Sequence, residues 1–174
     1  MQLKDKVDVM LTELGRMKCF DKRQKITFWI LDKNPCLILD EPNRVERLKS
    51  IEVVQSNELN SPFEEIGFIA VDNCLIQESN CDFVLFKKEK LFFCEAKMNM
   101  TAKDKLEDNV EKAMSQIEIT KQFFNEKLFG LGKIEAFIGV PAEFTKNPTS
   151  TQKIEKDILK NKRISVKIGH KISL

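Results

Sequence analysis

The sequence has no tyrosine, a single histidine, a single tryptophan and only six glycines. Tyrosine chemistry is therefore excluded, and a histidine mechanism would depend on His170 alone. The glycine-rich phosphate-binding loop, the G-x-S-x-G nucleophile motif and the dinucleotide-binding glycine pattern are all absent from the sequence. The absence of these three motifs argues against a P-loop enzyme, a serine hydrolase of the G-x-S-x-G type and a dinucleotide-dependent enzyme.

Cysteine is present, but not in a pattern that suggests pairing. The five cysteines include no C-x-x-C pair and are Cys19, Cys36, Cys74, Cys81 and Cys94. This odd, scattered set predicts buried free thiols in a reducing cytosol rather than a disulfide framework or a cysteine-rich zinc site. No stretch approaches the ~18 apolar residues of a membrane span, and the first residues lack the apolar region of a signal peptide. We therefore expect a cytoplasmic protein with no membrane association.

Composition indicates a globular protein of one domain. The chain has 174 residues, of which 42% are apolar and 32% are charged, and this is enough for a single domain over residues 1–174. Its 29 basic and 27 acidic residues give a formal charge of +2. Such a near balance does not by itself indicate a nucleic-acid-binding protein, although it is compatible with a local basic surface.

Hydrophobic periodicity predicts both helices and strands along the chain. Helices are expected at residues 2–16, 61–73, 103–128 and 150–161. Strands are expected at residues 25–31, 36–39, 48–54, 74–76, 82–86, 91–97, 134–140 and 164–168. The fold class is therefore α/β of mixed type, with a central mixed β-sheet flanked by helices.

Two of the predicted helices have specific signals. Ser61, Pro62 and Glu64 supply a capping residue, a proline at the first helical position and an acid at the third. The longest helix has an apolar stripe at three-and-four spacing. Its members are Leu106, Val110, Ala113, Ile117, Thr120, Phe124 and Leu128.

The most informative segment is a pair of short apolar strands joined by a charged turn at residues 87–90. Asp82 lies at the outer end of the first strand, Glu95 near the outer end of the second, and Lys97 two residues beyond Glu95. A turn with an even number of residues would place Asp82 opposite Glu95. Because side chains alternate between the faces of a strand, we expect Asp82, Glu95 and Lys97 on one face.

Two carboxylates in this arrangement repel, since directly opposed side chains have Cβ atoms roughly 4.5–5.5 Å apart. A divalent cation would offset the repulsion, because Mg²⁺ is commonly held by one or two carboxylates together with water and substrate phosphate. The acid-x-Lys triplet of Glu95 and Lys97 occurs once in the chain. The pattern predicts a metal site beside a phosphate, and a solvated, salt-bridged strand end is the alternative interpretation.

Asp82, twelve intervening residues and then Glu95-Ala96-Lys97 resemble the motif of the PD-(D/E)xK nuclease superfamily, which includes restriction endonucleases and Holliday-junction resolvases. The expected elements of residues 61–140 are also similar to the core of that family, αβββαβ. The resemblance implies a restriction endonuclease-like fold. Residues 1–60 would add an N-terminal helix and hairpin, and residues 141–174 a last helix and strand.

The resemblance also implies roles for individual residues. Asp82 and Glu95 would bind Mg²⁺ or Mn²⁺, and Lys97 would position or activate the attacking water and stabilise the phosphate. Family members often add an acid from the preceding helix, and Glu65 is the candidate for this further metal ligand; a solvated acid in a first helical turn is its alternative. Many members carry a glutamine on the following helix, which would be Gln116, and an ordinary helix-flank residue is the alternative there.

The leading hypothesis is a metal-dependent nuclease that hydrolyses DNA phosphodiester bonds with metal-activated water. The alternative is a catalytically inactive module of the same fold that binds nucleic acid or a protein partner. The near-neutral charge and small size favour that alternative, or else a homodimer or partner protein that completes the DNA-binding surface. Lys87, Lys88 and Lys90 are interpreted first as a solvated turn and second as phosphate contacts.

Overall fold

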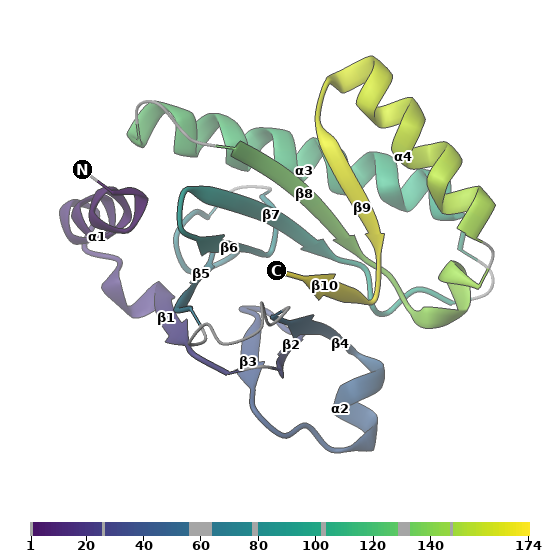
Figure 1. Cartoon of the computed structure of the whole chain (residues 1–174), viewed down its shortest axis with the longest axis horizontal. Helices are drawn as coiled ribbons and strands as arrows, with labels where there is room; N and C mark the ends of the chain where they lie inside the picture. The colour runs from purple at the N-terminus through teal and green to yellow at the C-terminus, as the bar shows by residue number, and fades with distance from the viewer. Residues whose placement is uncertain are drawn as a thin grey trace.

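A six-stranded mixed β-sheet forms the centre of the structure, in the strand order β1-β5-β6-β7-β8-β9 (Figure 1). The structure is a computed structural model and describes residues 2–25, 27–55, 64–77, 80–101, 104–128, 133–146 and 148–174. The strands of the sheet are β1 (Phe20–Arg23), β5 (Ile66–Ala70), β6 (Phe83–Lys87), β7 (Lys90–Ala96), β8 (Lys133–Gly139) and β9 (Ser165–Gly169). Neighbours from β1 to β7 are antiparallel, whereas β7, β8 and β9 are parallel to one another.

Helices cover one face of this sheet (Figure 1). Parallel neighbours need a crossover connection, and α3 (Leu106–Lys127) and α4 (Pro148–Lys162) supply the crossovers from β7 to β8 and from β8 to β9. A short helix, η2 (Ala142–Thr145), precedes α4, and α1 (Leu3–Glu13) adds its apolar side to the same core. The buried residues of α3 follow the predicted stripe and are Val110, Ala113, Met114, Ile117, Thr120 and Phe124.

A second sheet covers the other face, in the order β10-β4-β2-β3. Its elements are β2 (Thr27–Leu31), β3 (Leu37–Leu39), β4 (Ser50–Val54) and β10 (Lys171–Ser173), with α2 (Arg44–Leu48) between β3 and β4. A second hydrophobic core lies between the sheets, where Phe28 and Ile51 pack with Phe83 and Phe92. The central sheet is therefore buried on both faces, which explains why β5 and most of β6 and β7 are apolar without alternation.

The predicted fold class is confirmed, because a central mixed sheet is flanked by helices. The hairpin of β2 and β3 and the three longest helices also lie where the sequence predicts them. The short elements β1, α2 and β10 were missed, although α2 has a local signal, a capping box of Asn43 and Glu46. Within the described residues, no helix is both long enough and apolar enough to cross a bilayer.

The helix predicted from Ser61 is wrong where the structure describes that segment. Residues Ile66–Ala70 form β5, which is buried throughout and pairs with β1 and β6; Ser61–Phe63 lie outside the described residues. The capping signals are local, whereas an apolar segment with strands on both sides gains ladder hydrogen bonds and burial, and this tertiary pairing prevails over the helix signal. The strand predicted at residues 74–76 is reduced to one isolated bridge, between Asp72 and Ile76.

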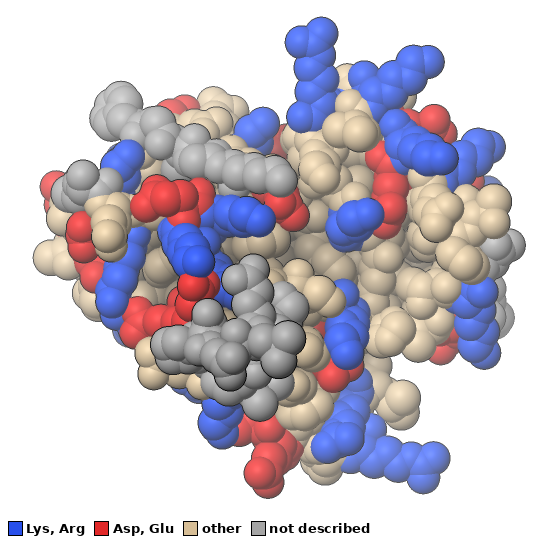
Figure 2. All heavy atoms as spheres, in the orientation of Figure 1, with Lys and Arg blue, Asp and Glu red and all other residues tan. Residues whose placement is uncertain are grey.

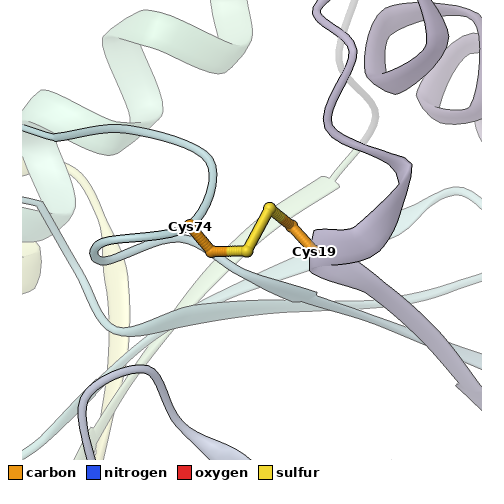
Figure 3. The surroundings of a disulfide bond; sticks show 2 residues. All are labelled: Cys19 and Cys74. Atoms are coloured by element: carbon orange, nitrogen blue, oxygen red, sulfur yellow. A yellow bond between two sulfur atoms is a disulfide. The ribbon is translucent and has the colours of Figure 1, made fainter.

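The prediction of free thiols is wrong for two of the five cysteines. Cys19 and Cys74 form a disulfide, with Cα atoms 5.6 Å apart (Figure 3). Cys19 ends the short helix η1 (Met17–Cys19), and Cys74 follows β5, so the bond joins segments 55 residues apart in the sequence. Spacing along the chain could not reveal the pair, because the pairing of β1 with β5 brings them together. The other three, Cys36, Cys81 and Cys94, are buried and free.

Gly67 gives a direct test of the packing in the central sheet. It lies opposite Phe86, and a Cβ atom added to it would be 2.1 Å from Cζ of that ring, which also stacks on Phe20. We expect Gly67→Ala to lower the free energy of unfolding by about 1–3 kcal/mol, since overpacking displaces a buried ring. Urea denaturation measures the loss. In a Phe86→Leu background the alanine should cost much less, and equal costs in the two backgrounds would contradict the contact.

The disulfide gives a second test. Because it closes a loop of 55 residues, reduction should lower the free energy of unfolding by about 2–4 kcal/mol. Urea denaturation with and without dithiothreitol measures this difference. A Cys19→Ala, Cys74→Ala double variant is the control, and it should not respond to the reductant. A wild-type protein equally stable in both conditions would contradict the bond.

Candidate functional site

The hairpin of β6 and β7 brings the two predicted acids together. Its turn has two residues, and Phe86 pairs with Leu91 and Val84 with Phe93, the register of an even-length turn. Beyond the last paired residues, the backbone N–H of Asp82 donates to Oε2 of Glu95 at 3.1 Å. Phe93 lies in the helix-side core, so alternation along β7 turns the Glu95 side chain toward α3.

Lys97 and Gln116 complete this arrangement. Nζ of Lys97 donates to Oε1 of Glu95 at 2.5 Å and to Oε1 of Gln116 at 3.1 Å. The Gln116 amide nitrogen in turn donates to the carbonyl oxygen of Asn80, at 2.9 Å, so its orientation is set from both ends. Asp82 Oδ2 accepts a hydrogen bond from the backbone N–H of Ala96. Four residues singled out from the sequence, Asp82, Glu95, Lys97 and Gln116, therefore form one connected group.

Thr120, one turn further along α3, connects the helix to the start of β6. Its hydroxyl accepts a hydrogen bond from Cys81 N–H at 2.9 Å and donates to the carbonyl oxygen of Gln116 at 3.0 Å. The side chain is fully buried. Helical spacing placed Thr120 in the apolar stripe, and the polar contact explains how a hydroxyl is accommodated there.

This group lies in a cleft of about 560 Å³ at the C-terminal end of β7. The cleft is lined by Asp32, Lys33, Asn34, Asp72, Asp82, Glu95, Ala96, Lys97, Asn99, Met100, Asp104, Asn109 and Gln116. In open α/β sheets, ligands bind in the crevice beyond the carboxyl ends of the strands, and this cleft has that position. Among the described lining residues, five are acids and two are lysines, so the cleft favours a cation over an anion.

Glu65 is not brought to the cleft. It precedes β5 at the end away from Asp82, and its carboxylate pairs with Lys4 at 2.9 Å and Lys22 at 3.4 Å. The candidate depended on the predicted helix, and that part of the chain is a strand instead. Three further acids that line the cleft were missed: Asp32 is in the turn after β2, Asp72 follows β5, and Asp104 precedes α3. No motif in the sequence distinguished these three acids as site residues.

Burial makes the acid pair electrostatically costly. Glu95 is 2% exposed, and burial, followed by the charge of Asp82, raises its pKa to about 8 despite the opposing effect of Lys97. Burial also raises the pKa of Asp82 to about 6; the Ala96 hydrogen bond lowers it, and the charge of Asp32 adds to the rise. The lysine therefore offsets only part of the cost of ionising the pair.

The donor set of the cleft fits a divalent cation. Asp82 and Glu95 offer two carboxylates at one place, and hard oxygen ligands of this kind suit Mg²⁺, which keeps several waters and needs few protein ligands. Across the described ranges, no cluster of three or more Asp, Glu, His or Cys side chains has the geometry of a metal site. Burial raises the pKa values of Cys81 and Cys94, the neighbours of the two acids, so these thiols are neutral and poor metal ligands.

The raised pKa values predict how stability depends on pH without added cation. The pKa of Asp82 is about 6 and that of Glu95 about 8, against 3.8 and 4.5 for ordinary carboxyls, so the folded state holds more protons than the unfolded state between about pH 4 and 8. Their contribution is complete below about pH 4 and is lost as the pH rises through 8. Between pH 6 and 8 we expect stability to fall by roughly 1 kcal/mol per pH unit. Urea denaturation at several pH values measures this slope.

Glu95→Gln is the matched variant, because it keeps the side-chain shape and removes the group with the higher pKa. Its stability should be nearly flat between pH 6 and 8. If wild type and variant lose stability in parallel over this range, the buried carboxylate is not the source of the slope.

Comparisons with known proteins returned no match. A scan against protein-family models found no family, and searches of curated proteins and of solved structures found no similar protein.

Proposed function

We propose that the protein is a nuclease that hydrolyses DNA phosphodiester bonds with a divalent cation, Mg²⁺ or Mn²⁺. The observation that carries the proposal is the convergence of a buried carboxylate, from Glu95, and a partly buried one, from Asp82, with the ammonium group of Lys97 in one cleft. The resemblance to the PD-(D/E)xK superfamily adds support. The first helix and first strand expected within residues 61–140 are not found in the described residues, so the order of helix, three strands, helix and strand is met instead by α1, β5, β6, β7, α3 and β8, with β1, β2, β3, α2 and β4 between α1 and β5.

In this proposal Asp82 and Glu95 hold the cation. When bound, the cation would polarise the phosphate and make a coordinated water more acidic. Lys97 supplies a positive charge next to the scissile phosphate, where its ammonium group donates hydrogen bonds to the oxygen atoms that gain charge. Gln116 holds the ammonium group through its side-chain oxygen, at 3.1 Å, and would keep Lys97 in the cleft if the Glu95 carboxylate held a cation instead of the lysine.

DNA is the proposed substrate, and it must approach an acidic cleft. Without a cation, the lining acids would repel a phosphate, so cation and phosphate would be expected to bind together. Figure 2 shows Lys and Arg side chains spread over one face of the molecule with Asp and Glu side chains between them, which is no uniform basic field. A homodimer or a partner protein that adds basic surface is therefore part of the proposal.

We propose a cytoplasmic location, which the proposed substrate and the buried free thiols of Cys36, Cys81 and Cys94 support. The disulfide between Cys19 and Cys74 argues against it, because disulfides are rare in a reducing cytosol. Blocking thiols during extraction from cells and then weighing the intact protein would report whether this bond exists in the proposed compartment.

The proposal predicts metal-dependent cleavage of plasmid, linear or branched DNA. Glu95→Ala and Lys97→Ala should each lower the cleavage rate by about 100-fold or more, since each removes a group that acts on the transition state. Glu65→Ala is the matched control, because this acid came from the same motif-based set but pairs with Lys4 outside the cleft. It should cleave like wild type in a gel assay with Mg²⁺ or Mn²⁺.

Cleavage that survives both cleft variants would contradict the proposal, and so would an equal loss in Glu65→Ala. If wild type does not cleave, calorimetric titration with Mn²⁺ separates the remaining possibilities. Binding that depends on Glu95 would indicate a non-catalytic module with a cation site. The absence of binding would leave a salt-bridged strand end as the correct interpretation of these residues.

A further inference from the structure

Asp32 links the second sheet to the chain segment that follows β7. It comes directly after β2, and its backbone N–H donates to the carbonyl oxygen of Lys49 at 2.9 Å, next to the start of β4. Its Oδ2 accepts hydrogen bonds from Met98 N–H and from Nδ2 of Asn99, both at 3.1 Å. Asp32 is therefore anchored in the second sheet, and its carboxylate binds the backbone just after β7 of the central sheet.

These hydrogen bonds lie next to Lys97. Because β7 ends at Ala96, the backbone of Lys97 is outside the regular ladder. Its own N–H donates to the carbonyl oxygen of Gly139 at 2.7 Å, and the next N–H along the chain is the one bound by Asp32. The lysine is thus held from β8 on one side and from the second sheet on the other, while its side chain, 22% exposed, extends to Glu95.

The Asp32 carboxyl is partly removed from solvent rather than fully solvated. Burial raises the pKa of its carboxyl, while the hydrogen bond from Met98 and the charges of Lys97 and Lys49 act in the opposite direction. A partly buried carboxylate is costly unless it is well paired, and this one is paired with backbone that carries a functional lysine.

We propose that Asp32 is a positioning residue of the cleft, which holds the backbone at Met98 and thereby sets where the ammonium group of Lys97 lies. The effect on catalysis rests on the proposed nuclease function, but the placement of Lys97 can be measured without DNA or metal. Asp32 would thus give the N-terminal hairpin, β2 and β3, a direct part in the site, although this hairpin is one of the elements between α1 and β5 that have no counterpart in the family order.

Two substitutions at Asp32 and one elsewhere make the test. Asp32→Ala removes both hydrogen bonds, whereas Asp32→Asn keeps a side-chain oxygen that can accept both. Asn43→Ala is the matched control, because it removes the N-cap of α2, whose oxygen accepts from Val45 N–H and Glu46 N–H, and so weakens the same layer without touching the cleft.

The first measurement is the rate at which acetic anhydride acylates Lys97 in the metal-free protein, read by mass spectrometry. Asp32→Ala should raise this rate about tenfold, because the ammonium group is released more easily when its backbone loses an anchor. Asp32→Asn and Asn43→Ala should both react like wild type. An unchanged rate in Asp32→Ala overturns the proposal, as does an equal rise in Asp32→Asn or Asn43→Ala.

The second measurement is steady-state cleavage together with Mn²⁺ titration. Asp32→Ala should lower kcat by about 10- to 100-fold, with KM and the Mn²⁺ affinity changed by less than about twofold, and Asp32→Asn should recover most of kcat. A loss of Mn²⁺ affinity in both variants would make Asp32 a cation ligand and overturn the positioning role. If wild type cleaves no DNA, the proposed function fails, and the acylation rates still decide whether Asp32 places Lys97.

Discussion

The pairing of β6 with β7 determines where the acidic side chains of the candidate site lie. A two-residue turn sets the register, and this register brings Asp82 next to Glu95 at the end of the strand pair. Because side chains alternate along a strand, a shift by one residue would send Glu95 into the core between the two sheets, where Cys94 packs now. The burial of β6 and β7 on both faces resists such a shift, so the core stabilises the site as well as the fold.

Residues of three layers of the structure line the cleft. The central sheet contributes Asp82 and Glu95, α3 contributes Gln116, and the turn after β2 in the second sheet contributes Asp32. The helices and the second sheet each pack on the central sheet through a separate hydrophobic core. A change that loosens either core would therefore move part of the cleft, and the side chains of the site depend on packing that lies well away from them.

The parts of the site that could be predicted from the sequence are those set by local rules. Strand alternation and an even turn were sufficient for Asp82 and Glu95, whereas Gln116 was named through the family resemblance. Glu65 was misplaced because strong capping signals suggested a helix in a segment that pairs as a strand with two neighbours. Asp32 could not be assigned, because its contact with Met98 arises only when the second sheet packs on the first.

The burial of the acid pair distinguishes it from the surface ion pairs of the same protein. Glu65 and Asp40 are partly exposed, and hydrogen bonds from Lys4 and Lys25 lower their pKa values, as expected for solvated pairs. Glu95 also has a lysine partner, yet its pKa is raised to about 8, because burial and the charge of a second acid outweigh one ammonium group. A pair of this kind reduces stability at neutral pH unless further positive charge is present. A divalent cation would supply that charge without changing the fold, because both carboxylates can coordinate one ion directly.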